Sequence, residues 1–155
     1  KIDRGQAEDA KEVDYVTGCA LLIKKSIIEA IGLLDTVYFT YFEDADWCWR
    51  ARKRGYKIYY VPSSKVWHKI SSTSSHQSDF YNYYFARNRI IFFRKHGRGI
   101  HKLFIYPYQI VLKSLAALFI FGLKHRSLKS AVAYFRGCID GLRHDLDYTV
   151  PGYPS

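Results

Sequence analysis

Apolar and polar positions along the first third of the chain predict short elements separated by glycines. The run from Val13 to Ile23 is apolar apart from a few residues such as Gly18, which is typical of extended structure. A short helix is predicted from Lys24 to about Ile31, with Gly32 in the place of a C-terminal cap. A second helix is predicted from Glu43 to Lys53, because acidic residues begin it and basic residues end it.

The middle of the chain contains two segments of strand-forming residues, then a polar segment, then a longer segment that predicts a helix. Tyr56 to Val61 is rich in strand-forming residues, and Lys65 to Ile70 is compatible with another short strand. The polar segment Ser71 to Ser75 predicts a loop. Ser78 is a suitable N-cap for a long helix that runs to about His96.

The last third of the chain is more apolar than the part before it. Leu103 to Leu123 approaches the length of about 20 apolar residues that spans a bilayer, but it contains Pro107 and Lys113. We expect a buried or interfacial helix there, and the pattern leaves open whether it spans, lies on or avoids a membrane. Ser127 begins a further predicted helix, to about His144, and the tail from Asp145 to Ser155 is expected to be loose.

The helix that follows Ser127 is amphipathic and basic. Its apolar stripe comprises Leu128, Val132, Phe135, Ile139 and Leu142, and its basic row comprises Lys129, Arg136 and Arg143. Such a helix suits an anionic membrane surface. It equally suits packing against another domain or a second copy of the chain, and the pattern leaves both open.

Composition narrows the class of protein. The chain has 155 residues and a formal net charge of +10, which attracts polyanions. Its three cysteines form no CxxC pair, so a reducing, cytosolic setting is expected rather than a disulfide framework. The first 13 residues are polar and do not resemble a signal peptide, and the chain contains no methionine. We therefore expect a piece of a longer protein.

Three carboxylates, at Glu43, Asp44 and Asp46, lie within four residues directly after a run of aromatic residues. From the first turn of a helix, a carboxylate can take a proton from a bound hydroxyl, as a general base does, and neighbouring aromatics can form an apolar wall for a sugar ring. The alternative is ordinary capping, with Asp46 and Arg50 as an i,i+4 ion pair. His68 ends a predicted strand and could bind a divalent metal or phosphate, or be structural.

Several motifs in order resemble those of family 2 glycosyltransferases, most closely the bacterial rhamnosyltransferase-like branch. The resemblance extends from about residue 13 to residue 96. It is carried by Val16-Thr17-Gly18-Cys19-Ala20-Leu21-Leu22-Ile23-Lys24-Lys25, Ile31-Gly32-Leu33-Leu34-Asp35, Tyr41-Phe42-Glu43-Asp44-Ala45-Asp46, Arg50, Arg54-Gly55-Tyr56, Val61-Pro62, His68, Tyr84, Arg87-Asn88-Arg89 and Arg94-Lys95-His96.

The resemblance implies an α/β fold. It would be a partial GT-A, nucleotide-diphospho-sugar transferase-like fragment with a few strands, followed by C-terminal helices. Residues 1–97 would form the acceptor-side part of the transferase domain, and residues 98–155 a helical appendage associated with a membrane. No nucleotide-binding βαβ half precedes these motifs in the sequence, so the fragment alone is expected to be inactive.

The resemblance also implies roles for individual residues. Asp44 would be the general base of an inverting transfer, and Glu43 would position the acceptor or the base. His68 would help to bind a divalent metal, Mg²⁺ or Mn²⁺, that neutralises the diphosphate leaving group. The expected substrate contacts are Gly18, Tyr41, Trp47 and Arg50.

The implied partners are a nucleotide-sugar donor and a glycan or lipid-linked acceptor in cell-surface polysaccharide synthesis. The implied location is cytoplasmic, at the inner face of the bacterial cytoplasmic membrane, and a homo-oligomer remains open. One alternative is a non-catalytic membrane-docking or assembly module. Nucleic-acid binding is motivated only by charge and by the aromatic and arginine residues from Tyr83 to Arg94, and we do not expect it, because no known nucleic-acid motif occurs.

Overall fold

The computed structural model describes residues 8–68, 78–97, 99, 108, 112–119 and 127–146. The chain forms two compact units. The first unit contains Lys1–Phe39 and Glu43–Lys69, and the second contains Thr40–Phe42 and nearly all of the chain from Ile70 onward.

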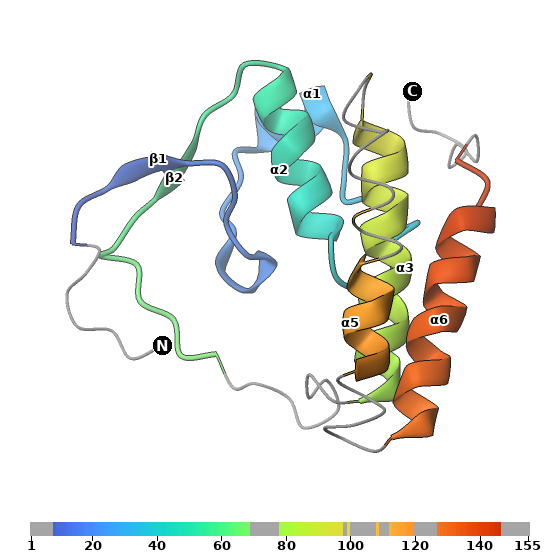
Figure 1. The fold of residues 1–155 in the computed structure, drawn as a ribbon. Coiled ribbons are helices and arrows are strands. Elements are labelled where there is room, and N and C mark those ends of the chain that lie inside the picture. The colour runs from blue at the N-terminus through green and yellow to red at the C-terminus, as the bar shows by residue number, and fades with distance from the viewer. Residues whose placement is uncertain are drawn as a thin grey trace. The chain divides into compact units, whose positions relative to one another are not determined.

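The first unit contains a small antiparallel sheet and two helices (Figure 1). Strand β1 (Lys11–Val13) pairs with β2 (Ile58–Tyr60), so that Lys11 lies opposite Tyr60 and Val13 opposite Ile58. The strand predicted at Tyr56 to Val61 is therefore confirmed in its central residues.

The extended segment predicted from Val13 to Ile23 is wrong over part of its length. Gly18–Ala20 forms a short 3₁₀ helix (η1), closed by the hydrogen bond from the Ala20 N–H to the Thr17 carbonyl at 3.3 Å. These residues are exposed, and neither sheet strand extends to them. With no partner strand among the described residues, a local turn satisfies the backbone instead.

Both helices predicted in this unit are present, α1 at Lys25–Ile31 and α2 at Glu43–Lys53. Gly32 ends α1 with φ of 90°, a value that favours glycine, and its N–H donates to the Ile28 carbonyl at 2.7 Å. Ile31 of α1 and Trp47 and Ala51 of α2 form the buried apolar cluster of this unit. Burial of these side chains joins the two helices.

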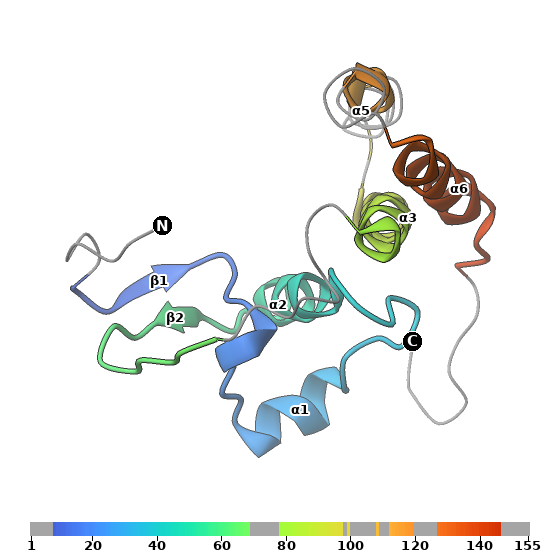
Figure 2. The same ribbon diagram turned by 90° about the horizontal axis from the view of Figure 1, so that it is seen from below.

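The second unit is helical. Helix α3 (Asp79–His96) packs along α6 (Leu128–Arg143), and α5 (Lys113–Phe119) contacts α6, as the end-on view in Figure 2 shows. The N-caps predicted at residues 78 and 127 are confirmed, because each serine Oγ accepts a backbone N–H three residues later. The common core comprises Ala86, Ile90, Ala117, Tyr134 and Cys138.

Helix α6 packs against α3 mainly through small residues, and Tyr134 is its one large buried side chain. Its buried residues are Ser130, Ala131, Tyr134, Gly137, Cys138 and Gly141. A Cβ at Gly137 would overlap the Tyr83 carbonyl oxygen, and one at Gly141 would lie 2.6 Å from the Arg87 carbonyl oxygen. The two backbones can approach this closely only because both positions are glycine.

The remaining predictions fall wholly or partly outside the described residues. Residues 65–68 form no strand, and residues 69–77, including the predicted loop, lie outside the described part. Of the predicted helix at 103–123, only residues 108 and 112–119 are described, and α5 is helical there. Residues 147–155 of the tail are also outside. No helix among the described residues is long and apolar enough to cross a bilayer. The domain boundary at residue 97 stays a prediction.

We predict that Gly137→Ala will lower the free energy of unfolding by about 1 kcal/mol. Overpacking of a tight contact costs about 1–3 kcal/mol, which outweighs the roughly 1 kcal/mol that alanine gains over glycine in a helix. Denaturant unfolding followed by far-UV circular dichroism measures the difference. Lys129→Ala, on the exposed side of the same helix, is the control and should change stability little. Equal stability of Gly137→Ala and wild type would contradict the close α3–α6 contact.

Candidate functional site

The candidate acidic residues begin α2, directly after a loop with an unusual backbone. Phe39, Tyr41 and Phe42 all have positive φ, at 59°, 61° and 75°. Non-glycine residues adopt this region rarely and at an energetic cost, so other contacts must stabilise the loop.

Within the second unit, Asn88 of α3 holds this loop. Its side chain is fully buried, and Nδ2 donates to the carbonyl oxygens of Thr40 at 2.5 Å and Tyr41 at 3.0 Å. The rings of Tyr41 and Phe42 add edge and tilted contacts to Phe85, with centroids 6.5 and 5.3 Å apart. These contacts hold the loop against α3 within the second unit.

The Asp44 carboxylate, in the first turn of α2, is held by donors from a distant segment. Its Oδ2 accepts hydrogen bonds from the Tyr15 hydroxyl at 2.9 Å and from the Gly18 N–H at 2.8 Å. Its Oδ1 lies 2.7 Å from the N–H of Ala45. Asp44 is half-buried, whereas Tyr15 and Gly18 are exposed, so the carboxylate lies at the surface of the first unit.

The segment from Tyr15 to Gly18 lies alongside the start of α2. Besides the two contacts to Asp44, the Cys48 thiol donates a long hydrogen bond, 3.8 Å, to the Val16 carbonyl oxygen. Burial raises the pKa of Cys48, so that the thiol remains a donor. A Cβ on Gly18 would lie 3.5 Å from Asp44 Oδ2, an ordinary contact, so Gly18 contributes here through its backbone N–H.

The Tyr15 hydroxyl acts as a hydrogen-bond donor to Asp44. Burial raises the pKa of its hydroxyl, and the hydrogen bond to Asp44 raises it further. The phenol therefore keeps its proton throughout the physiological pH range. A donor of this kind fixes the orientation of the Asp44 carboxylate without competing for the proton that a base would accept.

Glu43 differs from its neighbour. Burial raises the pKa of its carboxyl group, a backbone hydrogen bond opposes this, and the charge of Asp44 adds to the rise. Its Oε2 is buried and has no hydrogen-bond partner among the described residues. The two adjacent carboxylates are thus in different environments, a common arrangement where one acts as a base and the other has a different role.

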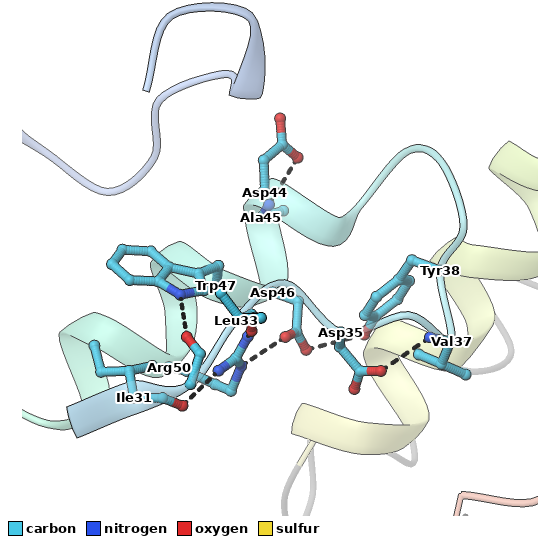
Figure 3. A network of polar contacts seen from close by, with 11 residues as sticks. Ile31, Leu33, Asp35, Val37, Tyr38, Asp44, Ala45, Asp46, Trp47 and Arg50 are labelled. Atoms are coloured by element: carbon cyan, nitrogen blue, oxygen red, sulfur yellow. Dashed lines mark hydrogen bonds and ion pairs between the residues drawn. The ribbon is translucent and has the colours of Figure 1, made fainter. Parts of the chain in front are cut away.

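Asp46 is directed into the protein. It is fully buried and accepts hydrogen bonds from the Tyr38 hydroxyl at 3.1 Å and from Arg50 Nε at 2.7 Å. The other Arg50 nitrogens donate to the carbonyl oxygens of Ile31 at 2.9 Å and Leu33 at 2.8 Å. Figure 3 shows Asp44 and Asp46 pointing in different directions from α2. The predicted i,i+4 pair is confirmed, and it is partly buried rather than a surface pair.

The expected substrate contacts occupy several environments. Trp47 is 4% exposed, and its Nε1 donates to the Gly32 carbonyl at 2.9 Å. Trp47 and Arg50 therefore have structural partners, Gly18 contacts Asp44, and Tyr41 packs in the second unit against Tyr81 with centroids 5.2 Å apart. Their contact with a substrate stays a prediction.

The described residues do not assemble a metal site. His68 is exposed and lies outside any helix or strand. Within the described ranges, no three histidine, cysteine, aspartate or glutamate side chains come close enough together to bind a metal ion. The residues present therefore do not fit the expected divalent ion by themselves.

Sequence reasoning did not single out Tyr15 as part of the site, and did not give Asn88 a role. Tyr15 lies 29 positions before Asp44, and no local pattern indicates that its hydroxyl meets that carboxylate. Asn88 lies 48 positions after Thr40. Its position in an Arg-Asn-Arg run on an otherwise aromatic helix was the available signal, because a buried asparagine needs partners for its amide.

Comparison with known proteins identifies the family. The sequence model of the family described as "Glycosyltransferase like family 2" matches residues 1–89, which is more than half of the chain. This chain belongs to glycosyltransferase family 2. A mixed fold of helices and one small two-stranded sheet agrees with part of a family 2 domain.

Proteins of known name that are similar to this chain include several that are named as sugar transferases. The chain is 35% identical over 54 residues to the low-salt glycan biosynthesis hexosyltransferase Agl10 of Haloferax volcanii, covering 35% of this chain and 18% of that protein. It is 39% identical over 64 residues to an N-acetylglucosaminyl-diphospho-decaprenol L-rhamnosyltransferase of Mycobacterium tuberculosis, covering 41% and 21%. It is 21% identical over 150 residues to the dTDP-rhamnosyl transferase RfbF of Shigella flexneri, covering 92% and 49%.

The chain thus spans between about a fifth and about half of the length of these relatives. No solved structure gives a significant match to it. The family assignment therefore comes from sequence, and the arrangement of the site described above comes from this structure.

We predict that Asp46→Ala will lower the free energy of unfolding by about 3 kcal/mol, because removing one partner of a buried ion pair leaves the other uncompensated. Chemical unfolding of the purified chain measures this. Asp14→Ala is a matched control, since Asp14 and Arg52 also pair at 2.7 Å, but with exposed side chains. Exposed pairs contribute about 0–1 kcal/mol. Similar losses for both variants would mean that the Asp46 network does not stabilise α2.

Proposed function

We propose that the protein transfers a sugar from a nucleotide-diphosphate donor to a hydroxyl group of a glycan or lipid-linked acceptor, with Asp44 as general base. Family membership supports sugar transfer. The observation that carries the assignment of the base is the Asp44 carboxylate, which is held at the surface of the first unit by Tyr15 and Gly18.

In the proposed reaction, Asp44 accepts the proton of the acceptor hydroxyl as the acceptor oxygen attacks the anomeric carbon of the donor. The bond between that carbon and the diphosphate oxygen breaks, and the nucleoside diphosphate leaves with the electron pair. Attack from the side opposite the leaving group inverts the configuration. A positioned general base of this kind contributes on the order of 10²- to 10⁴-fold.

The finer parts of the proposal rest on the names of relatives. RfbF is named for a dTDP-rhamnosyl donor, and the mycobacterial relative for a diphospho-decaprenol acceptor. We therefore propose rhamnose from a dTDP donor as the first donor to test. The proposed setting, polysaccharide synthesis at the inner face of the cytoplasmic membrane, comes from the sequence motifs and not from these names. The divalent metal expected at His68 remains a proposal that needs ligands beyond those the structure brings together, and no step above depends on it.

Asp44 also supports a non-catalytic interpretation. Its carboxylate joins the Tyr15–Gly18 segment to α2, which would stabilise a docking module that has no activity. Under that interpretation, removing the charge of Asp44 would change the stability of the first unit, and the protein would have no transferase activity to lose.

We predict that Asp44→Asn will reduce transfer by at least about 10²-fold, as expected for loss of a general base, while the fold is retained. The assay uses the complete gene product, a panel of nucleotide sugars headed by dTDP-rhamnose, a membrane-lipid extract and Mg²⁺ or Mn²⁺. Asp14→Asn, an exposed carboxylate of the same unit, is the control and should retain activity. A folded Asp44→Asn protein with wild-type turnover would exclude Asp44 as the base.

We predict that Tyr15→Phe will lower kcat about tenfold or more, because a hydrogen bond to a charged group contributes about 1.5–3 kcal/mol, and will leave the KM for the donor unchanged. A positioning role affects the orientation of the base rather than donor binding. Steady-state kinetics separate the two constants, and Tyr59→Phe on β2, which is 53% exposed, is the matched control. A rise in donor KM with constant kcat would assign Tyr15 to donor binding instead.

A further inference from the structure

The outward face of α6 is apolar. Its exposed side chains include Leu128 at 79%, Val132 at 58%, Ile139 at 47% and Leu142 at 42%. These residues recur at the spacing of one helical face. We call this row the outer stripe. Since α6 packs on α3 through its small residues, the outer stripe is not used in the core of the unit.

A row of basic side chains runs beside the outer stripe. Lys129, Arg136 and Arg143 are exposed and recur every seven residues, so they lie on one side of the helix next to the stripe. The Arg136 side chain is 78% exposed, and Asp140, 4.0 Å away, is the only acidic residue of α6. The Asp140 carboxylate also accepts a hydrogen bond from Tyr83 at 2.8 Å. The outward surface of the helix is therefore both apolar and positively charged.

The apolar surface continues from α6 onto α3. A groove of about 590 Å³ lies between the two helices, lined on α3 by Phe80, Tyr83 and Tyr84 and on α6 by Leu128 and Val132. Lys129 and Arg136 are also in its lining, together with one acidic residue, Asp79, whose carboxylate accepts a hydrogen bond from the Ser130 hydroxyl at 2.8 Å. The end-on view in Figure 2 shows α3 and α6 side by side. Apolar and basic side chains thus form one continuous surface rather than isolated exposed residues.

We propose that this face of α6 docks on the surface of a bilayer that contains anionic lipids. An amphipathic helix of this kind lies in the interface, with its apolar side chains at the acyl boundary and its basic side chains among the headgroups. The 16 residues of α6 are suited to lying along the surface, and no described helix is suited to crossing it. A second copy of the same face would bring two positive rows together, whereas anionic headgroups complement the row.

This inference deepens the proposed membrane location, and it does not rest on Asp44 as the base. It names the surface that would hold the protein where a lipid-linked acceptor is present. The Asp44→Asn protein should therefore bind vesicles as wild type does, even if all transfer is lost, which separates failure of the docking proposal from failure of the proposed reaction.

The test is co-sedimentation of the full chain with vesicles of phosphatidylcholine and phosphatidylglycerol, compared with phosphatidylcholine alone, at low and high salt. We expect wild type to prefer the anionic vesicles and to lose affinity as salt screens the charges. Replacing Lys129, Arg136 and Arg143 together by Gln should weaken binding on the order of a hundredfold, from roughly fivefold per charge. Val132→Glu should weaken it by at least about tenfold, because it removes an apolar contact and adds a negative charge that anionic headgroups repel.

Two controls decide whether the face or the overall charge is responsible. Replacement of Lys24, Lys25 and Lys65 by Gln removes the same charge from exposed positions of the first unit and should leave binding near wild type. Leu22→Glu, at a side chain that is 98% exposed, is the control for Val132→Glu. Circular dichroism establishes that each variant is folded.

Three results would overturn the proposal. In the first, wild type fails to sediment with anionic vesicles. In the second, the control triple variant loses as much affinity as the α6 triple variant, which would indicate that overall charge alone is responsible. In the third, analytical ultracentrifugation would show a dimer that Val132→Glu dissociates without any change in vesicle binding, which would make the face an interface between copies of the chain.

Discussion

The buried carboxylate of Asp46 is the constraint on which the first unit depends. It has no access to solvent, and it accepts hydrogen bonds from Tyr38 and from Arg50. Arg50 in turn uses its remaining nitrogens to hold the carbonyl oxygens at the end of α1 and just beyond it. A charge buried in this way is tolerated only with partners in good geometry. The start of α2 is therefore fixed relative to Tyr38 and to the end of α1.

Fixing α2 has a direct consequence for Asp44, two residues earlier in the same helix. The first turn cannot rotate without breaking the Asp46 contacts, so Asp44 keeps its direction toward Tyr15 and Gly18. The two aspartates therefore occupy different environments. One is buried and structural, whereas the other is half-buried and held at the surface, where a hydroxyl group could reach it.

The second unit depends on a different constraint, the close approach of α3 and α6. Gly137 and Gly141 leave no room for a side chain between the two backbones. Polar contacts reinforce the packing, including the hydrogen bond from Arg89 to the Tyr134 hydroxyl at 2.7 Å. Because small residues and Tyr134 form the inner face of α6, Leu128, Val132, Ile139 and Leu142 are left on the outside beside the basic row. The face of α6 that packs on α3 therefore also determines which of its side chains are exposed.

The sequence by itself determined the family, the α2 and α3 helices with their boundaries, and the acidic cluster as the candidate site. These are properties of neighbouring residues: charge at helix ends, serine caps, glycine stops and ordered motifs. Only the tertiary structure decided that Tyr15 meets Asp44 and that Asn88 holds the loop before α2. It also decided that α6 approaches α3 through its glycines, and that of the predicted apolar stripe Phe135 packs against the core while the other four residues are exposed. Those facts depend on contacts between residues 29 or more positions apart. The periodicity of apolar residues indicates which face of a helix is hydrophobic. It does not indicate how closely the backbones of two helices can approach each other.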